Sequence, residues 1–288
     1  MSLLIGTATG AFSLEERAEP LIEGTRINHL SRGPESWWAV DGKARIHRDG
    51  EMVAEMPDEA TPLCIQPAPD NVWIGADKAR LYTFDRGVIE EDAFFAEAPG
   101  REDWYTPWGA PADVRSMTVD AGHTLFINVH VGGILRYDNT GVVPTLDISA
   151  DVHQVAAHPT RADAVFAATA KGVAQSHNGH DFDFRTEGLH APYCRAILVL
   201  ADHLLVSAST GPGTQKGRLY RGSLWEGSLE PCTDGLPDWF EDNLNTHCLV
   251  GHEGSIYAGL HDTVWRSDDG GETWLEAATG LPQVTCLA

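Results

Sequence analysis

The feature that most constrains the fold is a short apolar segment that recurs along the chain at intervals of about 35 to 52 residues. Each copy except the last is followed by a second apolar segment and by a third strand-like segment, which leads into a polar turn such as Asp49-Gly50 or Asn178-Gly179. These patterns predict units of four antiparallel strands joined by hairpins. The predicted innermost strands of the units are 27–30, 62–65, 114–119, 152–157, 194–199, 246–250 and 284–287.

The two ends of the chain complement each other. Residues 3–7, 10–14 and 19–22 have the pattern of second, third and fourth strands without an inner strand, whereas 284–287 has the pattern of an inner strand without successors. Pairing the two sets completes a ring and removes the open sheet edge. We therefore predict an all-β, seven-bladed β-propeller with four antiparallel strands per blade, in which N- and C-terminal strands close one blade. Residues 1–288 form a single domain in this prediction.

The clearest hairpin lies at residues 264–274, VWRSDDGGETW. Aromatic and β-branched residues flank a turn in which Asp269 can accept backbone N–H bonds and glycine can take a positive φ. The spacing of Ser267, Asp269, Gly271, Thr273 and Trp274 matches the motif Ser-x-Asp-x-Gly-x-Thr-Trp.

This motif resembles the Asp-box of BNR-type β-propellers, a group that includes sialidase-like and sortilin-like proteins and is related to WD40/YVTN repeats. A shortened version of the motif occurs at 176–182. The resemblance implies that the box joins the third and fourth strands of a blade, far from the ligand face. It therefore indicates a fold rather than an activity.

Charge and composition exclude several classes of function. With 20 basic and 42 acidic residues the net charge is −22, which disfavours nucleic acid and anionic membranes as partners. A hydrophobic content of 42% argues against disorder, and no long apolar run predicts a membrane span. The five cysteines are odd in number and form no Cys-x-x-Cys pair, so we expect reduced thiols and a cytoplasmic location.

Candidate site residues follow from one position of the repeat. The resemblance implies that loops entering the inner strands, and loops between second and third strands, share one face around the central channel. The second residues of the predicted inner strands are Asn28, Leu63, Arg115, His153, Arg195, His247 and Thr285. Four consecutive blades thus present Arg, His, Arg and His. The adjoining loops add His130, His261, Tyr193, Trp104 and Trp239 to this face.

Three interpretations of these residues remain open. Arg115 and Arg195 are suited to a carboxylate or another anion, because guanidinium groups match carboxylate geometry. A divalent transition metal is the candidate cofactor, with His130, His153 and His247 as its ligands. The candidates for general acid–base catalysis are His153, His247 and Tyr193.

We expect a cytoplasmic propeller that binds a small, anionic, carboxylate-bearing or sugar-like ligand at the channel mouth. Arg115, Arg195, His130, His261, Trp104 and Trp239 are its predicted ligand-binding residues. The predicted chemistry is that of a hydrolase, such as a glycosidase with paired carboxylates, or of a lyase. Carboxylates available for a glycosidase are Asp103, Asp151, Glu241 and Asp242. The alternative is a non-enzymatic scaffold for a protein partner, with exposed tryptophans as the contact residues.

Overall fold

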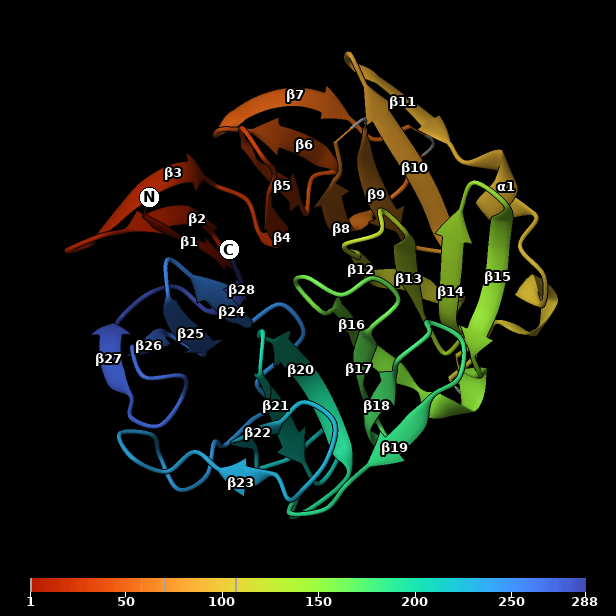
Figure 1. Cartoon of the computed structure of the whole chain (residues 1–288). Helices are drawn as coiled ribbons and strands as arrows, with labels where there is room; N and C mark the ends of the chain where they lie inside the picture. The colour runs from red at the N-terminus through yellow and green to blue at the C-terminus, as the bar shows by residue number, and fades with distance from the viewer. Residues whose placement is uncertain (1, 58, 70, 107) are drawn as a thin grey trace.

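The structure, a computed structural model, describes residues 2–57, 59–69, 71–106 and 108–288. Over these residues the chain forms seven four-stranded antiparallel sheets arranged in a ring (Figure 1). The chain ends lie side by side in that ring, in one and the same sheet. The predicted all-β, seven-bladed propeller is confirmed.

Each blade runs outward from the centre in the order of its strands. Blade 1 consists of β28 (Val284–Leu287), β1 (Leu3–Thr7), β2 (Gly10–Leu14) and β3 (Ala18–Glu23). Blade 2 consists of β4 (Ile27–Arg32), β5 (Trp37–Asp41), β6 (Arg45–Arg48) and β7 (Glu51–Glu55). Blade 3 consists of β8 (Pro62–Pro67), β9 (Val72–Ala76), β10 (Arg80–Asp85) and β11 (Val88–Glu91). Blade 4 consists of β12 (Asp113–Val119), β13 (Leu125–His130), β14 (Gly133–Asp138) and β15 (Gly141–Leu146).

The remaining three blades follow the same plan. Blade 5 consists of β16 (Val152–Ala157), β17 (Val165–Thr169), β18 (Gly172–Ser176) and β19 (Asp183–Arg185). Blade 6 consists of β20 (Tyr193–Val199), β21 (His203–Ser209), β22 (Arg218–Ser223) and β23 (Glu230–Pro231). Blade 7 consists of β24 (Leu249–His252), β25 (Ser255–Leu260), β26 (Thr263–Ser267) and β27 (Leu275–Ala278).

Short helical segments lie in the loops that lead to the inner strands of blades 4 and 5. They are α1 (Ala93–Ala96) and the 3-10 turns η1 (Arg101–Asp103) and η2 (Ile148–Ala150). Across the described residues, no helix has the length and apolar character needed to cross a membrane.

The hydrophobic core lies between blades rather than at one centre. One cluster joins Val40 and Ile46 of blade 2 to Ile65 and Ile74 of blade 3, and the other clusters follow the same pattern around the ring. Burial falls from the inner strands to the outer ones: every residue of β13 is buried, whereas β7 is mostly exposed. Each blade therefore needs both neighbours to cover its apolar faces.

The ring is closed by pairing between the two chain ends. β28 pairs antiparallel with β1, with Ile5 opposite Leu287 and Gly6 opposite Cys286. The backbone N–H of Leu4 donates to the Ala288 carbonyl at 2.8 Å, and the N–H of Ala288 donates to the Leu4 carbonyl at 3.0 Å. Leu287 also packs in the cluster that joins blade 1 to blade 7.

One predicted strand differs from the structure. The inner strand of blade 7 was predicted at 246–250, but β24 begins only at Leu249. His247 has a left-handed φ of 65°, and the backbone N–H of Cys248 donates to the Asn245 carbonyl at 3.0 Å in a turn. A non-glycine residue at positive φ interrupts the extended conformation that a strand needs.

The hairpin between β26 and β27 is held by side-chain hydrogen bonds within the turn. Asp269 accepts from the backbone N–H groups of Glu272 and Thr273 at 3.0 and 2.9 Å, and the Ser267 hydroxyl accepts from the Gly271 N–H at 2.8 Å. Trp274 is 1% exposed, and its indole N–H donates to the Gly271 carbonyl at 3.2 Å. In the turn after β18, Asn178 has the equivalent role and accepts from two backbone N–H groups.

Deletion of residues 283–288 should remove the inner strand of blade 1 and uncover apolar surface on two blades. We expect an insoluble product, or a Tm more than about 10 °C below that of the full chain in differential scanning calorimetry. A deleted protein that melts like the full chain would contradict closure by β28.

Replacement of Asp269 tests the hairpin. Hydrogen bonds from Thr273 hold the pKa of Asp269 well below its usual value, so its stabilising contribution exists above about pH 4 and is lost as the pH falls. We expect Asp269→Ala to lower the Tm at pH 7, and the difference from wild type to shrink as the pH is lowered below about 4. Asp269→Asn should lower the Tm less, because Asn178 serves in the matching turn. A difference that is constant with pH would contradict the role of the carboxylate charge.

Candidate functional site at the channel mouth

A β-bulge marks the second position of the inner strands. In blade 4, Val114 pairs with Val129 and Ser116 pairs with Asn128, so Arg115 is an extra residue in the ladder. The ladder of blade 5 shifts in the same way at His153, and that of blade 6 shifts between Cys194 and Ile197, around Arg195. The equivalent positions in blades 1, 2 and 3 show the same shift at Thr285, Asn28 and Leu63. Bulges re-aim a side chain away from the sheet face, and they are common beside functional sites.

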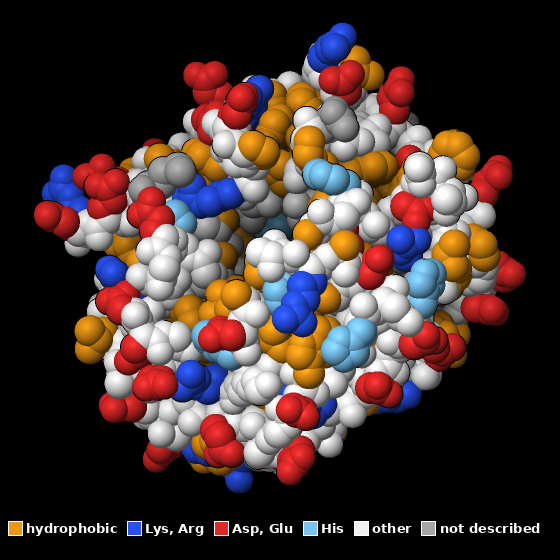
Figure 2. All heavy atoms as spheres, in the orientation of Figure 1, with side chains coloured by type: hydrophobic (Ala, Val, Ile, Leu, Met, Phe, Trp, Pro, Cys, Tyr) orange, Lys and Arg blue, Asp and Glu red, His pale blue; other side chains and the backbone are white. Residues whose placement is uncertain are grey.

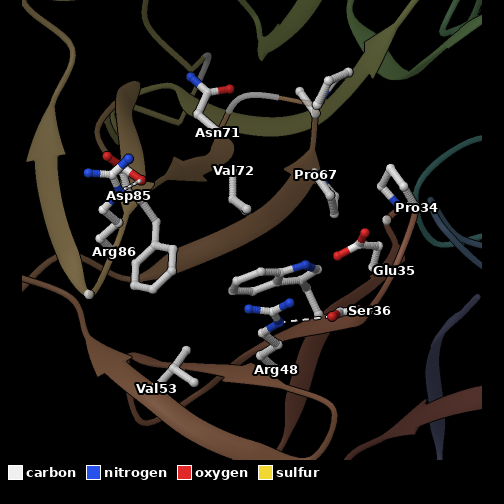
Figure 3. A pocket seen from close by; sticks show the side chains of 16 residues that line it. Pro34, Glu35, Ser36, Arg48, Val53, Pro67, Asn71, Val72, Asp85 and Arg86 are labelled. Atoms are coloured by element: carbon white, nitrogen blue, oxygen red, sulfur yellow. Dashed lines mark hydrogen bonds and ion pairs between the residues drawn. The ribbon is translucent and has the colours of Figure 1, made fainter.

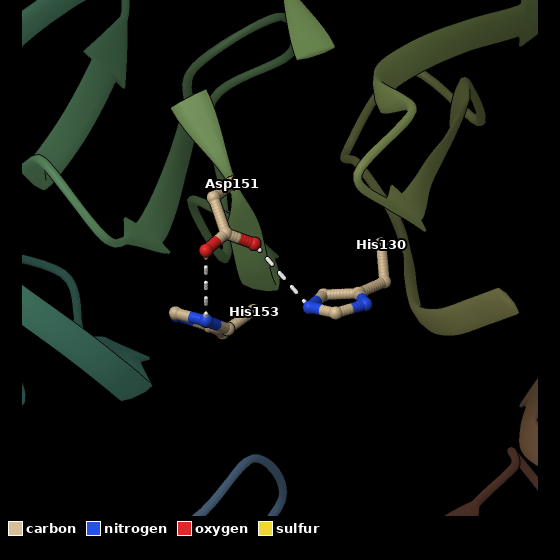
Figure 4. A group of neighbouring side chains, drawn as sticks. All are labelled: His130, Asp151 and His153. Atoms are coloured by element: carbon tan, nitrogen blue, oxygen red, sulfur yellow. Dashed lines mark ion pairs between the residues drawn. The ribbon is translucent and has the colours of Figure 1, made fainter. Parts of the chain in front are cut away.

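The bulged His153 belongs to a cluster with His130 and Asp151. The Nε2 atom of His130, at the end of β13, lies 3.3 Å from Oδ1 of Asp151, and Nε2 of His153 lies 3.8 Å from Oδ2 (Figure 4). The two imidazoles are 3% and 2% exposed, whereas the Asp151 side chain is 37% exposed. Asp151 follows η2 and has a left-handed φ of 50°. The carboxylate thus covers two buried imidazoles on their solvent side.

Three polar atoms of this cluster have no hydrogen-bond partner among the described residues: Nδ1 of His130, Oδ1 of Asp151 and Nε2 of His153. His153 donates through Nδ1 to the Cys194 carbonyl at 2.5 Å, which leaves Nε2 as the atom with the free lone pair. Burial lowers the pKa of His153 to about 4, so this imidazole is neutral at pH 7. Leaving a buried polar atom without a partner costs about 1–3 kcal/mol. Two of these atoms, Asp151 Oδ1 and His153 Nε2, lie where the carboxylate meets the imidazoles, whereas Nδ1 of His130 lies on the other side of its ring (Figure 4).

Two arginines lie next to this cluster without a carboxylate partner. Arg195 donates to Oδ1 of Asn245 at 2.5 Å and to the Tyr193 hydroxyl at 3.2 Å, both neutral groups. The Arg115 side chain forms no hydrogen bond or ion pair with the residues that the structure describes, although the charges of Asp113 and Asp151 act on it through space. Burial and then the nearby Arg195 charge lower the pKa of Arg115. The attraction of Asp113 on Arg115 is larger than the repulsion by Arg195, but neither guanidinium group is in an ion pair among the described residues, so both are suited to bind an anion.

Of the other predicted residues, Tyr193 lies within the same group. Its ring centroid is 4.7 Å from that of His153, and the guanidinium of Arg195 stacks 5.5 Å above its ring. Trp108, which is 65% exposed, adds a ring 5.6 Å from His130. The structure thus brings together His130, His153, Tyr193, Arg115 and Arg195.

Four predicted residues lie elsewhere. The His247 ring hydrogen-bonds through Nε2 to the Arg115 carbonyl at 3.0 Å and lines a cavity of about 250 Å³. Its centroid lies 3.8 Å from that of the His29 ring, and the two rings are tilted by 37°. That cavity is formed by later residues of the inner strands, including Met117 and Val155. Trp104 packs against Phe95 and Arg101, and Trp239 lies 3.9 Å from the Arg218 guanidinium. The exposed His261 side chain forms no hydrogen bond, ion pair or ring contact with the described residues.

Sequence reasoning missed two features of this face and one elsewhere. Asp151 was considered only as one of several rim carboxylates, and Asn245 was not considered. Neither could be found from strand periodicity, since both lie in loops before inner strands. A groove of about 730 Å³ between blades 2 and 3 was also missed (Figure 3). It is lined by Trp38 and Phe84 together with the turns at Pro34 and Pro67, and the proline-rich turns were its only sequence signal.

The surface charge is distributed unevenly. In Figure 2 most acidic side chains lie toward the outer part of the visible face, and some histidine side chains lie beside the central hollow while others lie farther out.

No family model matches the sequence, and no curated protein matches it. Several solved structures resemble the fold. Virginiamycin B lyase from Staphylococcus aureus, in a catalytically inactive variant with quinupristin, is 13% identical over 88% of this chain and 84% of that chain, with a TM-score of 0.64. An ancestral GH74 enzyme is 12% identical over 95% of this chain and 40% of that chain, with a TM-score of 0.63. The WD40 propeller domain of Doa1 is 12% identical over 95% and 83%, with a TM-score of 0.61. Identities this low establish the propeller fold alone.

The contact between the buried His29 and the partly buried His247 predicts acid sensitivity. Burial lowers the pKa of His247 to about 4, and burial together with the His247 charge lowers the pKa of His29 well below 6.5. An unfolded chain binds these protons more readily, so stability is lost as the pH falls from about 6.5 toward 4. Protonation of His247 alone should lower the free energy of unfolding by about 2 kcal/mol between pH 7.5 and pH 5.0.

We expect urea unfolding to show that the free energy of unfolding falls less between pH 7.5 and pH 5.0 in His247→Asn than in wild type. Asparagine suits the left-handed backbone at this position. The exposed His180→Asn variant should keep the wild-type pH dependence. Equal pH dependence in His247→Asn and wild type would contradict the assignment.

Proposed function

We propose that this protein binds a small carboxylate-bearing ligand, such as a sugar acid, at the channel mouth, and acts on it as a lyase or a hydrolase. The observation that carries the proposal is the pair Arg115 and Arg195, whose charges act on each other and whose guanidinium groups form no ion pair with a carboxylate of the described residues.

Arginine is the side chain that matches a carboxylate best, because its donors are arranged as a planar fork. Arg195 is already oriented by Asn245 and Tyr193, so little conformational entropy remains to be lost on binding. A ligand anion would also relieve the repulsion between the two arginines. This combination supports an anionic ligand over a neutral one.

The proposed chemistry rests on the neighbours of the arginines. Elimination and hydrolysis both require groups that polarise a bound ligand or accept a proton from it. His130, Asp151 and His153 supply nitrogen and oxygen atoms without partners, and the Tyr193 hydroxyl can donate a proton while it accepts from Arg195. A lyase and a glycoside hydrolase family occur among proteins of similar fold, which supports the two reaction classes by analogy only. His247, His261, Trp104 and Trp239 have no role in this proposal.

Three related assignments belong to the same proposal. The hydrogen bonds of the 264–274 hairpin support a relationship to Asp-box propellers. Five buried, unpaired cysteines support a reducing, cytoplasmic location. The exposed side chains of Tyr105 and Trp108 favour a second function, that of a scaffold for a protein partner. The WD40 propeller domain of Doa1, which has a similar fold, supports this alternative by analogy only.

Calorimetric titration with a panel of small carboxylates tests the proposal. The panel includes glucuronate, pyruvate and malate, and glucose serves as the neutral counterpart of glucuronate. At least one carboxylate should bind saturably, and Arg195→Ala should weaken its binding by about 1.5–3 kcal/mol, or about ten-fold to more than a hundred-fold in Kd.

Arg221→Ala is the matched control, because Arg221 lies on β22 and pairs with Glu272 on the outside of the ring. It should bind the carboxylate as wild type does. Absence of saturable binding by every member of the panel, or equal loss in both variants, would contradict the proposal and favour the scaffold.

A further inference from the structure

We propose that His130, Asp151 and His153 form a binding site for a divalent transition metal of borderline softness, such as Zn²⁺. This inference deepens the function proposed above and rests on it only in assigning the metal to the ligand-binding mouth. His247, which the sequence suggested as a third imidazole ligand, is replaced here by the Asp151 carboxylate.

The donor set carries the inference. Two imidazole nitrogens and one carboxylate oxygen are the ligands found in catalytic zinc centres with three protein ligands. Magnesium and calcium prefer oxygen ligands, so a site with two imidazoles selects against them. The candidate ligand atoms lie within 4.8 Å of one another. Figure 4 shows both imidazoles facing the same carboxylate, one toward each of its oxygens.

The distances require adjustments of the side chains. Two ligands at about 2.0–2.1 Å from a tetrahedral metal are about 3.3 Å apart. The contact between His130 Nε2 and Asp151 Oδ1 already has this length, and His153 Nε2 lies 3.8 Å from Oδ2. The three candidate ligand atoms lie within 4.8 Å of one another, so the two imidazoles must rotate toward each other, as well as toward Asp151, for all three to reach one metal.

The surroundings of His153 are those of a metal ligand. Its Nδ1–H donates to the Cys194 carbonyl, which fixes both the ring and the tautomer that leaves Nε2 free. Nε2 is buried, has no partner among the described residues and faces the carboxylate. The contact between His130 Nε2 and Asp151 Oδ1 alone does not account for the cluster, because Nε2 of His153 also faces the carboxylate and has no hydrogen-bond partner among the described residues.

The site has fewer protein ligands than a structural zinc centre, which has four, but as many as a catalytic zinc centre, which has three. Three protein ligands leave at least one coordination position open, and Asp151 lies on the solvent side of the two imidazoles. The charge of Asp151 acts on Arg115, so the guanidinium groups proposed to bind the anion lie near the open coordination position of the metal. A carboxylate ligand held by the arginines could therefore also contact the metal.

Isothermal titration of the full chain with Zn²⁺ tests the inference directly. The protein is prepared without a polyhistidine tag, treated with a chelator and dialysed. We expect one saturable Zn²⁺ per chain, an increase in Tm on adding Zn²⁺, and at least about 100-fold weaker binding of Mg²⁺.

Asp151→Asn is the primary variant because asparagine tolerates the left-handed backbone and preserves the side-chain volume. It should weaken Zn²⁺ binding at least about 100-fold, and His153→Ala should do the same. Asp163→Asn is the matched control: Asp163 also has a left-handed φ, of 59°, and is 40% exposed, but it pairs with Arg136. It should bind Zn²⁺ within about two-fold of wild type.

Absence of a saturable site in wild type, or wild-type affinity in Asp151→Asn, would overturn the metal site. Arg195→Ala separates this inference from the proposed function. It should keep the Zn²⁺ affinity and lose the carboxylate affinity. If the carboxylates bind in an Arg195-dependent way while Zn²⁺ does not bind, only the metal site is wrong. If Zn²⁺ binds and no carboxylate does, only the ligand proposal is wrong.

Discussion

The pairing of β28 with β1 is the interaction on which the rest of the structure depends. Apolar clusters lie between blades, so each blade is stable only while both neighbours cover it. Without this pairing the ring would have two exposed blade faces and a free sheet edge. Closure also holds the inner strands at fixed positions around one axis. A site assembled from several blades depends on that fixed arrangement, although none of its residues lies in blade 1.

The bulges of the inner strands convert this repeated scaffold into a mouth with specific chemistry. The extra residue in each ladder breaks the alternation of the strand and re-aims one side chain. Blades 4, 5 and 6 place Arg115, His153 and Arg195 at this position, whereas blades 1 and 3 place Thr285 and Leu63 there. The same bulge therefore has a structural role in blades 1 and 3, whereas in blades 4, 5 and 6 it directs arginine and histidine side chains toward one another.

The fold was largely predictable because strand rhythm, hairpin turns and complementary ends are local signals. The equivalent position of Arg115, His153 and Arg195 was also readable, since it depends only on counting from the start of each inner strand. Within the cluster, His130 and His153 were predicted from the sequence, but Asp151 was not predicted as their partner, because the left-handed turn of its loop has no signature in periodicity. His247 was misjudged in position for a similar reason: its left-handed backbone sends the ring toward His29 rather than toward the mouth.

The central claim is that bulged positions of neighbouring blades, together with the loops beside them, form one binding site. Anomalous diffraction at the zinc edge, from crystals grown with one equivalent of Zn²⁺, tests this claim most directly. The account predicts a dominant peak between His130, Asp151 and His153, within about 2.0–2.2 Å of one atom from each side chain. Peaks confined to exposed histidines such as His180, with none at the channel mouth, would contradict it.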